Sequence, residues 1–126
     1  MKLLHEDITG EIIKAFYKVH NVLGYGFLEK IYENAMMIEL RKQGLSAKKQ
    51  EPIIVYYDGQ IVGDYRADIL VEDTVILELK AVKEIIEKHE VQLVNYLKAT
   101  EIEVGLLLNF GETPQVKRKI FHNEFK

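Results

Sequence analysis

The stretch YRADILVEDTVILELKA, Tyr65–Ala81, decides the fold of this 126-residue chain. It is typical of two buried β-strands rich in Ile, Leu and Val, joined by a short polar turn. Asp68, Glu78 and Lys80 interrupt this apolar pattern. A charge inside a buried strand is costly unless a partner compensates it. The stretch therefore predicts a β-hairpin whose charged groups have a compensating partner.

The length of the turn decides on which face of the sheet these charges lie. Alternate residues of a strand share a face, so Glu78 and Lys80 should point the same way. A three-residue loop, Glu72–Thr74, would pair Asp68 with Glu78 and bring both carboxylates to one face. A two-residue loop would pair Asp68 with Leu77 and separate them. In the first register the carboxylates repel each other unless one takes up a proton or a cation lies between them.

A divalent cation is one way to relieve that repulsion. Oxygen ligands without cysteine or histidine in the motif suit Mg²⁺ or Mn²⁺ better than Zn²⁺, and the chain contains no cysteine. The competing interpretation is a solvated ion pair, because Glu-x-Lys triplets are common on exposed strands. The preceding aspartate and the apolar setting add weight to the metal site, and both interpretations stay open at this point.

The flanking segments predict the remaining elements. Apolar residues at helical spacing predict three helices, at residues 6–22, 27–43 and 82–99. In the second helix we expect an inward face made of Leu28, Ile31, Ala35, Ile38 and Leu40. Short apolar runs predict five strands, at residues 52–57, 60–71, 74–81, 103–111 and 116–123, with a tight turn at Asp58-Gly59. This order predicts an α/β sandwich with a mixed central sheet flanked by helices.

Composition narrows the functional classes. At this length we expect one domain, residues 1–126. No apolar run is long enough for a membrane span or a signal peptide, so we expect a soluble, cytoplasmic protein without a membrane partner. The net charge of −3 gives no overall attraction for nucleic acid, so a polyanion would have to be held locally or through a bound cation.

Several separated motifs resemble one known family. ADILVEDTVILELK resembles the Asp…Glu-x-Lys signature of the PD-(D/E)xK nuclease superfamily, with Ala67 where that signature often has proline. GFLEKIY, Gly26–Tyr32, matches the motif that names the GxxExxY proteins, small domains assigned to that superfamily. The Q-x-P of residues 50–52, QLVNYLKAT from Gln92 and VGLLLNFG from Val104 also match, so the resemblance covers nearly the whole chain.

The resemblance implies a restriction-endonuclease-like αβββαβ core and metal-dependent hydrolysis of nucleic acid, with DNA favoured over RNA. Carried over by position, Asp68 and Glu78 would bind Mg²⁺ or Mn²⁺, and the Leu79 carbonyl would add a ligand. Lys80 would orient or help to deprotonate the attacking water and stabilise charge on the phosphate.

Other candidate residues come from the helices. By resemblance, Glu29 would be an acid that a preceding helix brings to the site. Gln92 and Tyr96 resemble the Gln-x-x-x-Tyr motif of RecB-like members, and their spacing of four places both on one helix face. Tyr32 fits the site and the core equally well, and we expect His20 to be a hydrogen-bonded structural residue rather than a metal ligand.

A non-catalytic nucleic-acid-binding or protein-interaction module on the same fold is the alternative function. The complete set of Asp68, Glu78 and Lys80 favours an enzyme. The small size, the acidic net charge and the lack of a DNA-reading element argue against an enzyme that acts alone, and favour a homodimer or a subunit of a larger assembly. A glycosidase-type carboxylate pair fits less well because it leaves Lys80 unexplained.

Overall fold

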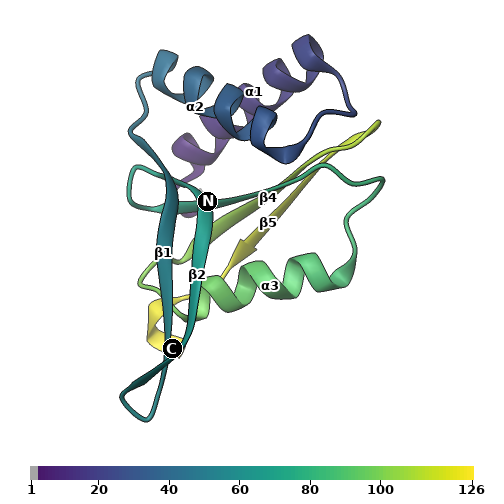
Figure 1. Ribbon diagram of the computed structural model, residues 1–126. Coiled ribbons are helices and arrows are strands. Elements are labelled where there is room, and N and C mark those ends of the chain that lie inside the picture. Colours follow the sequence, from purple (N-terminus) through teal and green to yellow (C-terminus); the bar gives the residue numbers. More distant parts are fainter. Residues whose placement is uncertain (1–2) are drawn as a thin grey trace.

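Helices cover both faces of a five-stranded sheet in the computed structural model, which describes residues 3–126 (Figure 1). The helices are α1 (Glu6–Leu23), α2 (Glu29–Lys42) and α3 (Glu87–Lys98), and a 3-10 turn, η1 (Asn123–Phe125), follows the last strand. The strands are β1 (Ala47–Tyr57), β2 (Gln60–Val71), β3 (Val75–Lys80), β4 (Val104–Phe110) and β5 (Pro114–Ile120). Helices α1 and α2 lie on one face of the sheet and α3 lies on the other. None of the helices in this part of the chain is long and apolar enough to cross a membrane.

The sheet is mixed, as the sequence predicts. Its strands lie in the order β1-β2-β3-β4-β5. Strands β3 and β4 are parallel, and every other neighbouring pair is antiparallel. A parallel pair requires a long crossover connection, which α3 provides here. Every residue of β4 is buried, as expected for a strand covered by helices on both faces.

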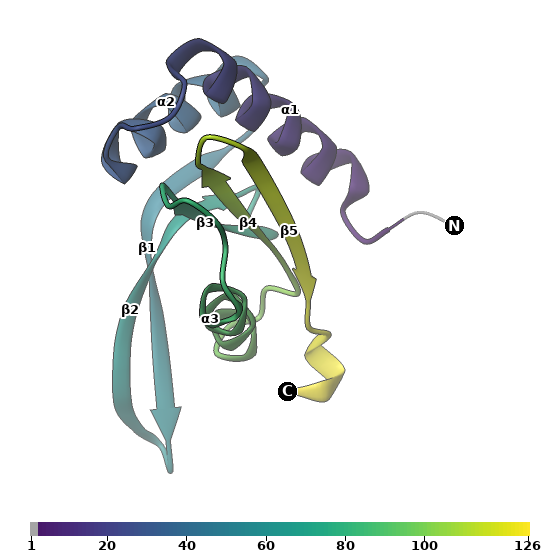
Figure 2. The same ribbon diagram turned by 90° about the vertical axis from the view of Figure 1, so that its right-hand side faces the viewer.

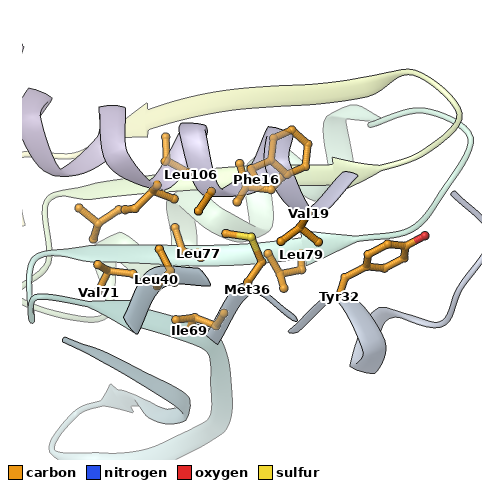
Figure 3. Close-up of a cluster of buried hydrophobic side chains, with 14 of the residues drawn as sticks. Phe16, Val19, Tyr32, Met36, Leu40, Ile69, Val71, Leu77, Leu79 and Leu106 are labelled. Carbon is orange, nitrogen blue, oxygen red and sulfur yellow. The ribbon is translucent and has the colours of Figure 1, made fainter. Parts of the chain in front are cut away.

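The larger core lies between the α1–α2 helix pair and the sheet (Figure 3). On α1, Ile12, Phe16 and Val19 are buried at the spacing of one helix face. The Phe16 ring meets Phe110 of β4 edge-on at 4.8 Å between centroids. This packing holds the helices against β3 and β4. The central strands are therefore rigid, and they hold the charged residues Glu78 and Lys80 in place.

Tyr32 is part of this core. Its ring is fully buried and stacks on Phe110 at 4.2 Å between centroids. Its hydroxyl donates to the Gly24 carbonyl at 2.7 Å and accepts from the Phe27 N–H at 3.2 Å. Gly24 and Gly26 have φ angles of 70° and 105°, which glycine adopts without strain. Tyr32 therefore packs in the core and ties down the turn between α1 and α2.

The inward face of α2 differs from the prediction. The buried apolar residues follow a stripe with a spacing of about four, at Tyr32, Met36, Met37 and Leu40. Of the residues expected inside, Leu40 is buried and Ala35 is half-buried, whereas Leu28, Ile31 and Ile38 are 79%, 42% and 62% exposed. The helix carries apolar side chains on more than one side, so contacts with α1 and the sheet, rather than hydrophobic periodicity, set its rotation.

Helix α3 begins at Glu87, five residues later than the predicted start at residue 82. Side chains from β4 and β5 bind the backbone of the intervening loop. Asn109 accepts from the Val82 N–H at 3.0 Å and donates to the Val82 carbonyl at 2.9 Å. The Gln115 side chain accepts from the Ile85 N–H at 3.1 Å. Because these bonds satisfy backbone groups that a helix would otherwise use, the segment before Glu87 remains a loop, with a bend at residues 82–84.

The β1–β2 hairpin is long and projects past α3 (Figure 2). The predicted turn at Asp58-Gly59 closes it, with φ angles of 52° and 74°. Strand β1 begins at Ala47, ahead of the predicted start at Pro52. An edge strand tolerates this proline, which cannot donate a ladder hydrogen bond.

The hairpin bends where Gln50 faces Asp68. Gln50 has a φ angle of 58°, and the described register passes from Lys49↔Ile69 to Glu51↔Ala67 without a pair between Gln50 and Asp68. A smaller core lies on the other face of the sheet and contains Leu93, Tyr96 and Leu97 of α3. The inward-facing side of β2 changes at the bend, because Ile69 packs in the larger core whereas Ala67 packs in the smaller one. The regular alternation assumed from the sequence therefore breaks at Asp68.

Candidate active site

The β2–β3 turn sets the register of the charged residues. Val71 pairs with Val75, which leaves the three-residue loop Glu72–Thr74. Glu72 and Asp73 have φ angles of 52° and 53°, and the Thr74 N–H donates to the Val71 carbonyl at 3.0 Å. This is the register that the sequence analysis required for a shared site, and it places Asp68 across from Glu78.

Asp68 and Glu78, called here the carboxylate pair, replace the backbone ladder at this point. The last described pair between β2 and β3 is Ile69↔Leu77. Beyond it, the Asp68 N–H donates to Glu78 Oε1 at 3.2 Å, and the Leu79 N–H donates to Asp68 Oδ2 at 2.7 Å. Among residues 3–126, Asp68 Oδ1 and Glu78 Oε2 receive no hydrogen bond from the chain. Each carboxylate is thus held by one oxygen, and its second oxygen remains available to a ligand.

Burial and mutual repulsion disfavour a double negative charge on the carboxylate pair. Glu78 is only 6% exposed. Burial, followed by the charge of Asp68, raises the pKa of Glu78 to about 8. Burial also raises the pKa of Asp68, and the hydrogen bond from Leu79 only partly offsets this increase. Without a cation, at least one of the two carboxyl groups therefore binds a proton at neutral pH.

Lys80 lies two residues beyond Glu78 on β3 and is half-buried. Its positive charge lowers the pKa of both carboxyl groups, but less strongly than burial raises them. Within the described chain its ammonium group has no carboxylate within ion-pair distance. Lys80 also lowers the pKa of His89 on α3, after the larger effect of burial, so this histidine lies near the same end of the sheet.

The Leu79 carbonyl faces the same side as the carboxylate pair. Leu79 directs its N–H toward Asp68 on β2. In an extended strand the N–H and C=O of one residue point to the same neighbour. The Leu79 carbonyl therefore points toward β2, the strand that carries Asp68.

Helix α2 adds two acidic residues at this end of the sheet. Glu29 is exposed in its first turn, and its charge raises the pKa of both Asp68 and Glu78. Glu33, one turn later, is 6% exposed and acts more strongly than Glu29 on Asp68. Gln50 Nε2 donates to both oxygens of Glu33, at 3.3 and 3.2 Å.

Glu33 is not among the site residues predicted from the sequence. It follows the buried Tyr32, and its position four residues after Glu29 places the two acids on neighbouring turns. The correct inward face of α2 would have revealed it as a buried acid.

Gln92 and Tyr96 lie on α3, on the side of the helix that is near the carboxylate pair. Gln92 Nε2 donates to the Tyr96 hydroxyl oxygen at 3.0 Å. Burial, followed by the charges of Glu78 and Asp68, raises the pKa of Tyr96 to about 12. The Tyr96 phenol therefore stays protonated and, because it accepts from Gln92, its own proton is free to be donated.

His20 lies outside this group. Its Nε2 lies 2.7 Å from the Gly111 carbonyl oxygen, to which it donates. The ring thus links α1 to the end of β4, as expected for a structural histidine.

The donor set fits a hard cation that keeps part of its water shell. Residues 3–126 contain no group of three or more His, Cys, Asp or Glu side chains arranged to hold a metal ion. The carboxylate pair and the Leu79 carbonyl provide oxygen donors only. Mg²⁺ is commonly bound by one or two carboxylates while it retains several waters, so these residues fit Mg²⁺ or Mn²⁺.

Comparisons with known proteins agree with this architecture. Residues 6–120 match the PD-(D/E)XK nuclease superfamily. No curated protein matches the chain. A solved structure described as "Crystal structure of SSO0001" aligns with a TM-score of 0.60 and 16% sequence identity. The alignment covers 75% of this chain and 50% of that one, so the present chain corresponds to about half of the other protein and the likeness concerns the fold.

Proposed function

Because the chain belongs to the PD-(D/E)XK nuclease superfamily, we propose that it is a divalent-metal-dependent nuclease that hydrolyses phosphodiester bonds of DNA, with RNA as the second substrate to test. The carboxylate pair is the observation that carries the proposal. A buried carboxylate, Glu78, beside a half-buried one, Asp68, each with one free oxygen, forms an arrangement that a cation stabilises and that structural packing alone does not require.

Asp68, Glu78 and the Leu79 carbonyl would hold Mg²⁺ or Mn²⁺. An ion bound there would lower the pKa of a coordinated water and stabilise negative charge on the phosphate. The backbone bonds to Asp68 Oδ2 and Glu78 Oε1 fix the orientation of both carboxylates before the ion arrives. Binding would therefore require little rearrangement of the chain.

Lys80 would act on the attacking water and on the phosphate. In hydrolysis the water oxygen bonds to phosphorus and releases a proton to the solvent, while the bond to the leaving sugar oxygen breaks and the leaving oxygen takes up a proton. Negative charge grows on the phosphate oxygens during this step. An ammonium group that no described carboxylate neutralises can orient the water and stabilise that charge.

The helical residues would position substrate and water. Tyr96, held by Gln92, would donate its proton to a phosphate oxygen or a bound water. Glu29 is exposed at the start of α2, where its carboxylate would accept a hydrogen bond from a water at the site. These roles are positional, so their loss should reduce the rate less than the loss of the carboxylate pair.

A cleavage assay tests the proposal. Purified protein is incubated with Mg²⁺ or Mn²⁺ and labelled single-stranded, duplex and branched DNA, and RNA. We expect cleavage of at least one substrate by wild type and none by Asp68→Asn or Glu78→Gln. Asp73→Asn is a matched control, because this exposed carboxylate belongs to the same hairpin at a positive φ angle that asparagine accepts. If wild type cleaves nothing although metal binds, the chain is a non-catalytic binding module.

A further inference from the structure

A groove runs between the outer β1–β2 hairpin and α3 and ends beside the candidate active site. A cavity of about 610 Å³ lies between the hairpin and the C-terminal part of α3. A second cavity, of about 290 Å³, continues to Gln92 and Tyr96. Both are lined by Val55, Tyr65 and Asn95, so they adjoin each other, and the two together are called the hairpin groove. Figure 2 shows the hairpin arm passing beside α3, which is seen end-on.

The charge in the hairpin groove is opposite to that of the whole chain. The chain has 20 acidic residues and a net charge of −3, yet no Asp or Glu is among the described residues that line the two cavities. Lys88 lies toward the inner end and Lys98 toward the outer end. Gln92 and Asn95 follow Lys88 by four and seven residues, so they share its helix face. The groove therefore offers cations and amide groups to a polyanion.

Exposed aromatic rings line the opposite wall. Tyr56 is 63% exposed and Tyr65 is 48% exposed, and both come from the hairpin. The Tyr65 ring lies 5.6 Å from the Tyr96 ring between centroids. Aromatic side chains beside a cationic groove are the usual means by which proteins bind unpaired nucleic acid. Base faces in a duplex are covered by their stacked neighbours, whereas an unpaired strand exposes them.

We propose that the hairpin groove binds a single strand of nucleic acid and leads it to the carboxylate pair. Bases would stack on Tyr56 and Tyr65, and phosphates would lie against Lys88 and Lys98. Tyr96 joins the two regions, because it lines the groove and packs in one cluster with Ala67, the neighbour of Asp68 on β2. The inference rests on the proposed nuclease function for its purpose, but strand binding is measurable without cleavage.

The experiment measures binding without metal. Wild type in EDTA is titrated against a fluorescent single strand of about 12 nucleotides, in DNA and RNA versions, and against the duplex of the same sequence. We expect tighter binding of the single strand than of the duplex. Tyr65→Ala should weaken single-strand binding roughly 5- to 100-fold, the range expected for one lost base stack. Tyr65→Phe keeps the ring and should bind like wild type.

Two controls separate the groove from general surface effects. Tyr57→Ala removes a neighbouring tyrosine that is 75% exposed and does not line the described groove, and it should leave binding unchanged. Lys88→Gln should lower the slope of log affinity against log salt by about 0.7, the value for one phosphate contact on a single strand. Lys42→Gln, at the far end of α2, should leave that slope unchanged.

Equal binding by Tyr65→Ala and Tyr57→Ala would overturn the inference, as would equal affinity for duplex and single strand. Absence of any binding by wild type would do the same. If, in addition, Tyr65→Ala disrupts self-association in sedimentation, a second copy of the chain occupies the groove.

Cleavage measured in parallel keeps this inference apart from the proposed function. If wild type binds single strands through Tyr65 but cleaves nothing, the proposed strand-binding groove is supported and the proposed nuclease function is contradicted. If wild type cleaves and Tyr65→Ala binds single strands as tightly as wild type, the nuclease function is supported and the strand-binding groove is contradicted.

Discussion

The Asp68 amide donates to Glu78 Oε1 at 3.2 Å, so one member of the carboxylate pair is held by the backbone of the other. The Leu79 N–H fixes Asp68 in turn, at 2.7 Å. These bonds occupy the place where the β2–β3 ladder would otherwise continue. Regular backbone pairing between β2 and β3 therefore ends at this point, and hydrogen bonds that orient the two repelling carboxylates take its place.

The first prediction concerns pH. The folded-state pKa of Glu78, about 8, lies above its ordinary value of 4.5, so the folded protein retains a proton that the unfolded chain has released. This contribution to stability is fully present below the unfolded pKa and is lost as pH rises through about 8. Thermal melting in EDTA should show that stability decreases between pH 4.5 and about 8, and that the decrease is smaller in Glu78→Gln. The exposed control Glu84→Gln should follow wild type, and identical curves for wild type and Glu78→Gln would contradict the electrostatic description of the site.

The second prediction concerns metal binding. Mg²⁺ or Mn²⁺ at about 100 times its dissociation constant should stabilise the fold by about 2.7 kcal/mol and raise the melting temperature by roughly 10 °C. Asp68→Asn should abolish this increase. Without metal, the same variant should melt at or above the wild-type temperature, because the repulsion is relieved and the amide oxygen still accepts from Leu79. A full metal response in Asp68→Asn would place the ion elsewhere.

The third prediction distinguishes the catalytic role of Lys80 from the metal-binding role of the carboxylate pair. Lys80→Ala should reduce the cleavage rate by about 10²–10³-fold, as for the loss of one well-placed charge donor. It should retain the metal-induced melting shift, because an ammonium group cannot bind a cation. Lys83→Ala, an exposed lysine in the following loop, is the control. Cleavage by Lys80→Ala at the wild-type rate would mean that the activity arises at another site.

The fourth prediction decides between the two roles considered for Tyr32. Tyr32→Phe keeps the stack on Phe110 but leaves the Gly24 carbonyl and the Phe27 N–H without their partner. It should lower the free energy of unfolding by about 1–3 kcal/mol in urea titrations and leave cleavage per folded molecule unchanged. Tyr25→Phe, an exposed tyrosine in the same turn, should change neither quantity. A loss of cleavage with stability intact would move Tyr32 into the site.

Local patterns predict much of the hairpin that carries the site. The length of the Glu72–Thr74 loop predicts the register of β2 and β3 up to the Ile69–Leu77 pair, as observed, whereas the break in alternation at Asp68 is not predicted by strand parity. Asp58-Gly59 likewise predicts the β1–β2 turn. Both features depend on neighbouring residues, so the sequence contains the necessary information.

Features that depend on distant contacts were predicted less well. Ile31 and Ile38 resemble core residues in the sequence, but packing against α1 rotates α2 so that Tyr32, Met36 and Glu33 face inward. The start of α3 moves because Asn109, far along the chain, binds the backbone of Val82. These outcomes require knowledge of which segments meet in space.

The bend at Gln50 also depends on a contact between segments that are distant in the sequence. Its positive φ angle coincides with its hydrogen bonds to Glu33, a contact between two separate elements. No local pattern around Gln50 indicates this contact.

The proposed metal site can be located by the position of Mn²⁺ in crystals of the protein, measured by anomalous scattering at the manganese absorption edge. We expect a peak bounded by Asp68 Oδ1, Glu78 Oε2 and the Leu79 carbonyl in wild type, and no peak there in Asp68→Asn. No peak in wild type at saturating Mn²⁺, or a peak away from the carboxylate pair that persists in Asp68→Asn, would contradict the proposed site.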